Sequence, residues 1–183
     1  CGVYKWVLFW NLPIQNGEVI DMIIRQILTF ILLFLTSCGN PSDSPLKTWM
    51  EPNGKIKVLA TIEMIEDLVK GVGGDYVDTT TLVQGELDPH TYQLVKGDDE
   101  KLAFAQVIFY NGLGLEHGPS LRTFLKDSKK AHSLGNAIQE DNPSLILTYN
   151  GSLDPHIWMD MSLWAQAIDP IVTALSSFDP DHS

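Results

Sequence analysis

The sequence has only two cysteines, Cys1 and Cys38, among 183 residues. Both precede the part of the chain that is expected to fold. Neither a disulfide framework nor a cysteine-rich zinc site is therefore available to that part. Any metal bound there must be held by nitrogen and oxygen ligands.

Positive charge is also scarce. Twelve Lys and Arg residues stand against 23 Asp and Glu, which gives a net charge of −11. Such a chain repels phosphate backbones, so we expect no nucleic acid partner. With 44% hydrophobic and 9% aromatic residues the composition is that of a globular protein and not of a disordered one.

The amino-terminal region lacks an apolar run long enough to span a bilayer. Nine mostly apolar residues, 27–35, follow Arg25, and the small residues Thr36, Ser37, Cys38 and Gly39 come next. A positive residue, a short apolar run and small residues are typical of a secretory signal peptide, whereas a spanning helix needs about 20 apolar residues. The competing interpretation is a buried helix that happens to end in Cys38.

The sequence divides into four expected segments. These are an atypical extension over 1–21, a signal peptide over 22–38, a linker over 39–54 and a folded lobe over 55–183. The chain begins with Cys1 and not Met, and it ends on a turn-like Asp-Pro-Asp-His-Ser. We therefore expect a fragment of a longer protein.

Strand-like and helix-like segments alternate along 55–183. Strands are expected over 55–61, 78–83, 107–111, 131–134 and 144–149, and helices over 63–70, 98–106, 120–126 and 162–178. This alternation predicts an α/β lobe with a mostly parallel sheet flanked by helices. Ligands of such folds bind beyond the carboxyl ends of the strands.

The tetrapeptide Leu-Asp-Pro-His occurs twice, ending at His90 and at His156. Both copies are expected to follow strands, which would bring the two histidines to the same edge of the sheet. Proline stiffens each loop, and Asp88 and Asp154 could each orient a histidine ring by accepting its second N–H. Two interpretations compete. The histidines either are solvated loop residues without a ligand role, or they share a metal site.

Other motifs point to structure and not to chemistry. His117 is expected at the surface before a helix, and His132 and His182 have no suggestive context. The glycines of 112–118 do not match a dinucleotide loop, and those of 71–74 are expected to end a helix. Asn150-Gly151 predicts a tight turn. No serine or cysteine stands in a pattern that predicts a nucleophile.

Three motifs resemble one known family. They are GELDPHTY over 85–92, YNGLGLE over 110–116 and DPHIWMD over 154–160, in this order. The chain is similar to metal-binding solute receptors of ABC importers for zinc, manganese or iron, and it looks closest to chlamydial-type members. The resemblance covers about Lys55 to Asp181 and implies the amino-terminal lobe of a two-lobed, periplasmic-binding-protein-like fold, without the carboxy-terminal lobe.

The resemblance implies specific roles. His90 and His156 correspond to the histidines that bind the metal directly in this family, while two further ligands come from the second lobe. Residues 35–38 resemble the lipobox of bacterial lipoproteins, in which the cysteine, here Cys38, is diacylated. We therefore expect a monomeric, non-enzymatic receptor, anchored by lipid at the extracytoplasmic or periplasmic face of the membrane, with an ABC permease as partner.

Two other functions remain open. A secreted metallohydrolase would use His90 and His156 as two of three zinc ligands, together with a general base near an open coordination position. A surface adhesin without a metal role would make both histidines dispensable. Zinc, manganese and iron all stay open as the bound metal.

Overall fold

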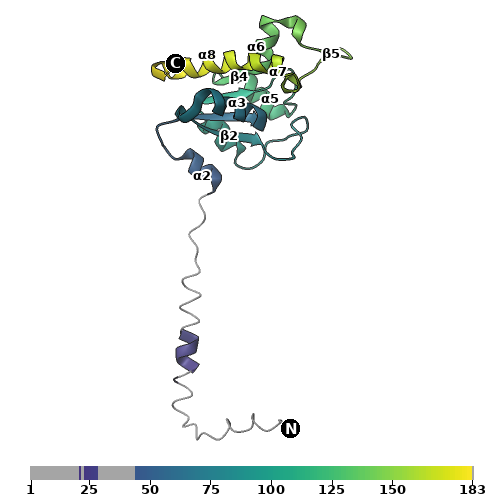
Figure 1. The fold of residues 1–183 in the computed structure, drawn as a ribbon. Helices are drawn as coiled ribbons and strands as arrows, with labels where there is room; N and C mark the ends of the chain where they lie inside the picture. The colour runs from purple at the N-terminus through teal and green to yellow at the C-terminus, as the bar shows by residue number, and fades with distance from the viewer. Residues whose placement is uncertain (1–20, 22, 29–43, 183) are drawn as a thin grey trace, which may run out of the picture. The chain divides into compact units, whose positions relative to one another are not determined.

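The computed structural model describes residue 21, residues 23–28 and residues 44–182 (Figure 1). Residues 21 and 23–28 are helical, and the chain from Ser44 onward forms a separate compact unit. No helix within the described ranges combines the length and apolar character needed to cross a membrane. Cys38, the expected lipidation site, lies outside the described residues.

A four-stranded parallel sheet forms the centre of the folded unit. Its strands are β1 (Ile56–Ile62), β2 (Val77–Val83), β3 (Val107–Tyr110) and β4 (Ala131–Ser133), in the order β2-β1-β3-β4. All seven residues of β1 are buried, as expected for a central parallel strand that is covered on both faces. The expected α/β fold with a parallel sheet is thereby confirmed.

Helices connect and cover the strands. Helix α3 (Glu63–Gly73) joins β1 to β2, α4 (Asp98–Phe104) leads from β2 to β3, and α5 (Pro119–Asp127) leads to β4. The chain moves one way from β1 to β2 and then the other way, past β1, to β3 and β4. The gap between β1 and β3 is therefore the topological switch point, where ligands bind in open α/β sheets.

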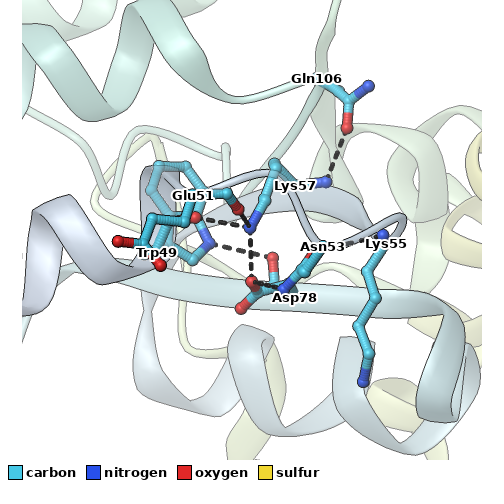
Figure 2. A network of polar contacts seen from close by, with 7 residues as sticks. All are labelled: Trp49, Glu51, Asn53, Lys55, Lys57, Asp78 and Gln106. Atoms are coloured by element: carbon cyan, nitrogen blue, oxygen red, sulfur yellow. Dashed lines mark hydrogen bonds and ion pairs between the residues drawn. The ribbon is translucent and has the colours of Figure 1, made fainter.

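The amino ends of the strands are fastened by a buried lysine (Figure 2). Lys57 donates from Nζ to the backbone oxygens of Trp49, at 2.6 Å, and of Glu51, at 2.7 Å. It also lies 2.6 Å from Asp78 Oδ2, which accepts a hydrogen bond from Asn53 as well. This network attaches the segment before β1 to the sheet, at the end opposite to the loops that carry His90 and His156.

The folded unit begins before residue 55, where the sequence predicted its start. Residues Pro45–Met50 form helix α2, with Ser44 as N-cap, and the Trp49 side chain is buried. The linker that was expected to extend to residue 54 thus includes residues that belong to the folded unit. Composition suggested a flexible stretch, but one large aromatic residue packs this segment against Phe104 of α4.

The middle of the chain differs most from the expectation. Helix α6 (Leu134–Asp141) was not predicted, and the expected strand over 144–149 is a 3-10 turn (Pro143–Leu145) followed by the two-residue strand β5 (Thr148–Tyr149). Strand β5 pairs antiparallel with β6 (Ser152–Leu153), outside the parallel sheet. The second Leu-Asp-Pro-His therefore begins on the last residue of a hairpin and does not follow a parallel strand, contrary to the prediction.

The carboxy-terminal helix is interrupted. The range 162–178 is divided among α7 (Met161–Trp164), a 3-10 turn (Ala165–Ala167) and α8 (Ile168–Phe178). Another 3-10 turn spans Pro180–His182. Helix α3 includes Gly71 and ends at Gly73, and Gly74 is its C-cap.

Candidate metal centre

His90 lies in the loop that follows β2, as predicted. Its backbone N–H donates to Asp88 Oδ1 at 2.9 Å, and Thr91 Oγ1 lies 3.3 Å from Asp88 Oδ2. The aspartate thus closes a tight turn across Pro89. The ring contact that the sequence suggested for Asp88 is replaced here by a contact to the backbone.

The first loop is anchored to α4 by a buried carboxylate. Asp98 is 2% exposed, and its Oδ2 accepts from the Tyr92 hydroxyl at 2.6 Å and from the Val95 N–H at 2.9 Å. Lys101 lies 3.2 Å from Asp98 Oδ1. Burial, together with the adjacent Asp98, raises the pKa of Tyr92, so the hydroxyl keeps its proton and acts as a donor. The sequence placed Asp98 in the first turn of a helix but gave no sign of this second role.

His156 is held by the same type of turn and by one further bond. Asp154 Oδ1 accepts the His156 backbone N–H at 3.0 Å and lies 2.6 Å from the ring nitrogen Nδ1. These two hydrogen bonds lower the pKa of Asp154, first through the backbone and then through the ring. Because the ionised carboxylate only accepts, Nδ1 carries a proton, and in the neutral imidazole Nε2 then presents its lone pair. The ring contact expected for Asp154 is confirmed.

The two histidines meet although 66 positions separate them in the sequence. The Nε2 atoms of His90 and His156 are 3.2 Å apart, and the ring centroids are 5.2 Å apart. The His156 side chain is 45% exposed, so the pair is open to solvent.

Other histidines are not part of this pair. The ring of His117 lies 5.8 Å from that of His90, and His117 is exposed just before α5, as predicted. His132 packs near Phe109, where burial lowers its pKa, and His182 stacks on Tyr76. Within the described ranges, no three His, Cys, Asp or Glu side chains are grouped closely enough to hold a metal ion.

A buried carboxylate supports the sheet edge at the carboxyl ends of β1 and β3. Glu116 Oε1 accepts from the Thr61 hydroxyl at 2.7 Å and from the Asn111 N–H at 2.9 Å, and Oε2 accepts from the Gly112 N–H at 3.0 Å. Burial raises the pKa of Glu116 although these bonds oppose the shift. Because Thr61 belongs to β1 and Asn111 follows β3, Glu116 bridges the topological switch point.

The loop over 112–116 depends on glycine. Gly112 has φ 75°, and a Cβ at this position would clash with the Ser133 side chain. The sequence predicted a turn leading into a helix here, which is confirmed by α5. It did not predict that Glu116 folds back into the turn, although the position of an acidic residue in an otherwise apolar, glycine-rich stretch was a usable signal.

Comparison with known proteins decides the family. The family model described as "Zinc-uptake complex component A periplasmic", ZnuA, matches residues 58–183. The chain belongs to the ZnuA family. The matched range includes both Leu-Asp-Pro-His loops, the Glu116 turn, strands β2, β3 and β4, and β1 from Val58 onward.

Individual relatives of the ZnuA family agree with this assignment. The metal-binding protein YtgA of Chlamydia muridarum is 39% identical over 70% of this chain and 40% of its own length. The metal ABC transporter substrate-binding lipoprotein SsaB of Streptococcus sanguinis is 30% identical over 82% of this chain and 51% of its own. The chain thus spans about half the length of these relatives.

A solved structure shows the same fold. The crystal structure of Fe(III)-bound YtgA from Chlamydia trachomatis is 42% identical to this chain, with a TM-score of 0.66. The match covers 69% of this chain and 45% of that one. The expected similarity to chlamydial-type members is thereby confirmed, as is the expectation that the described fold corresponds to only part of a two-lobed metal-binding protein.

Proposed function

We propose that this chain is the amino-terminal lobe of an extracytoplasmic solute-binding protein that captures a divalent transition metal and delivers it to an ABC importer. The single observation that carries the proposal is the 3.2 Å separation between the Nε2 atoms of His90 and His156. These two nitrogens are the proposed ligands. The metal is the cargo of the protein and is released to the permease.

The separation suits a shared ion. Two imidazole nitrogens bound at about 2.0 Å in a tetrahedral site lie about 3.3 Å apart. His156 already presents the Nε2 lone pair, because Asp154 holds the proton on Nδ1. Imidazole donors without thiolate suit Zn²⁺, Mn²⁺ or Fe²⁺ better than Cu(I).

Two histidines leave the coordination sphere incomplete. In the resembled family a second lobe supplies the remaining ligands, a His or Glu and an Asp or Glu, and this chain spans about half the length of its relatives. We therefore expect the chain alone to bind divalent metal weakly. A transport receptor that fills all positions with protein groups would leave none for a reactive water, which is the reason for proposing a carrier and not an enzyme.

A Zn²⁺ titration of the chain tests the proposal. We expect weak binding that is lost in His90→Ala and in His156→Ala and kept in the matched control His117→Ala, whose ring lies 5.8 Å from that of His90. Submicromolar affinity that His90→Ala abolishes would show that the second lobe is not needed. Binding that neither His90→Ala nor His156→Ala affects would refute the site and favour an adhesin without a metal role.

Turnover distinguishes the enzymatic alternative. A metallohydrolase would hydrolyse members of a panel of esters or phosphates, and this activity would depend on His156. We expect no hydrolysis by the wild-type chain above that of His156→Ala when both are supplied with Zn²⁺.

The membrane anchor is a separate part of the proposal. Cys38 ends a lipobox-like sequence, and two acyl chains on this residue are sufficient for stable anchoring. Expression in a bacterium with labelled palmitate should label the wild-type chain and Cys1→Ala, but not Cys38→Ala. Equal labelling of both variants would contradict lipidation at Cys38.

A further inference from the structure

The second Leu-Asp-Pro-His loop follows a hairpin, so the parallel sheet alone does not place His156 beside His90. A side chain at the sheet edge makes the connection. Asn111, directly after β3, donates from Nδ2 to the backbone oxygen of Pro155 at 2.9 Å, across 44 positions of sequence. This oxygen belongs to the peptide group that joins Pro155 to His156.

That peptide group is held on both sides. Its oxygen accepts from Asn111 and also from the Ile157 N–H, at 2.8 Å, while its N–H donates to Asp154 at 3.0 Å. A peptide plane fixed at both its oxygen and its hydrogen leaves little freedom for the Cα of the following residue. The direction in which the His156 side chain leaves the backbone is therefore set partly by Asn111.

Asn111 is itself rigid. The residue is 0% exposed, its backbone N–H donates to Glu116, and its backbone oxygen accepts from the Gly135 N–H at 2.8 Å. A Cβ at Gly135 would lie 2.7 Å from this oxygen, so only glycine allows the start of α6 to approach so closely. The amide is thus a fixed point between the switch point of the sheet and the second loop.

The amide also carries an unusual cost. Nδ2 donates to Pro155 and to the Gly112 oxygen at 3.0 Å, whereas Oδ1 is buried without a hydrogen-bond partner among the described residues. Buried polar atoms without partners are rare and costly, and an apolar side chain of similar shape would avoid the cost. The presence of asparagine here indicates that its donor group is needed.

We infer that Asn111 is a positioning residue for His156, acting through the Pro155 carbonyl. The inference rests on the proposed metal-binding function of the histidine pair. The His90 loop has its own anchor in Tyr92 and Asp98, so loss of the Asn111 amide displaces His156 and leaves His90 in place.

Asn111→Leu, which keeps the approximate shape and removes the donor, tests this role. In the metal-free chain we expect the NMR contact between the His90 and His156 rings to be lost, and Zn²⁺ affinity to fall about tenfold, as for other groups that orient metal ligands. The matched control is Asn136→Leu. Asn136 accepts the Leu113 N–H at 3.0 Å in the loop that follows Asn111, and it lies on the exposed surface of α6. This control should leave both readouts unchanged.

The outcomes separate the two proposals. Wild-type Zn²⁺ binding that is independent of His156 refutes the proposed function. Zn²⁺ binding by the wild type that depends on His156 supports the proposed function. If Asn111→Leu then keeps both the contact between the rings and the Zn²⁺ affinity, only the positioning role is overturned. If Asn111→Leu fails to fold, an NMR measurement on the wild-type protein tests the positioning role. A scalar coupling between Asn111 Nδ2 and the Pro155 carbonyl carbon that is present before Zn²⁺ is added and persists in the loaded chain supports the role, and its absence or its loss on loading contradicts it.

Discussion

The carboxylate of Asp154 lies 2.6 Å from Nδ1 of His156 and also accepts the backbone N–H of the same residue. One oxygen thus fixes both the turn and the ring. In the other copy of the tetrapeptide, Asp88 accepts from the backbone N–H of His90 and from Thr91. Two identical sequences therefore support their histidines in different ways.

This difference predicts unequal effects of identical substitutions. Asp154→Asn keeps an oxygen for the turn but loses the charge that holds the proton on His156 Nδ1, so Zn²⁺ affinity should fall about tenfold. Asp88→Asn should leave the affinity nearly unchanged. Isothermal titration of the two variants measures the difference, and equal losses would show that the Asp154 ring contact has no special role.

A second prediction concerns the network at the opposite end of the sheet. Lys57→Met removes the charged partner of Asp78, which keeps only its hydrogen bond from Asn53, and removes a donor from two backbone oxygens, so the free energy of unfolding should fall by about 3 kcal/mol. The control is Lys70→Met. Lys70 pairs with Glu66 at 3.0 Å, but its side chain is 54% exposed, and its removal should cost less than about 0.5 kcal/mol. Urea denaturation compares the two, and equal costs would mean that the Lys57 network contributes little.

A third prediction concerns acid stability. Burial opposes the ionisation of Glu66, but hydrogen bonds from Thr79, Thr81 and Lys70 outweigh it and hold the pKa below the usual 4.5. The folded state therefore binds this proton less tightly than the unfolded state. The stability that Glu66 contributes is present above pH 4.5 and is lost as the pH falls through the lowered pKa.

Glu116 should behave in the opposite way. Burial raises its pKa above 4.5, so the folded state binds the proton more tightly, and the stability it contributes is present below pH 4.5 and lost as the pH rises through the raised pKa. Subtracting the stability profiles of Glu66→Gln and Glu116→Gln from that of the wild type should give pH dependences of opposite sign. Differences of the same sign would contradict the assigned environments.

The parts of the fold that were predictable have strong local signals. Strands β1, β2 and β3 are apolar or β-branched runs, and α3 shows apolar residues at helical spacing. Helix α6 was missed because it starts directly at the end of β4. Its signal was Ser133, whose side chain caps the helix by accepting the Asn136 N–H.

The sequence predicted which histidines form the candidate site but not how the fold brings them together. Both histidines were identified, yet the argument that each follows a parallel strand is right only for His90. The Asn150-Gly151 turn was visible, but not that it forms a separate hairpin. The contact between Asn111 and Pro155 joins segments 44 positions apart, and no local pattern in one sequence reports such a pairing.

The most direct test of the central claim is X-ray absorption spectroscopy of the Zn²⁺-loaded chain at a protein concentration high enough to saturate a weak site. The account predicts two imidazole ligands in the wild type and one in each of His90→Ala and His156→Ala, with His117→Ala unchanged. An imidazole count that stays the same when His90 or His156 is removed would contradict the account.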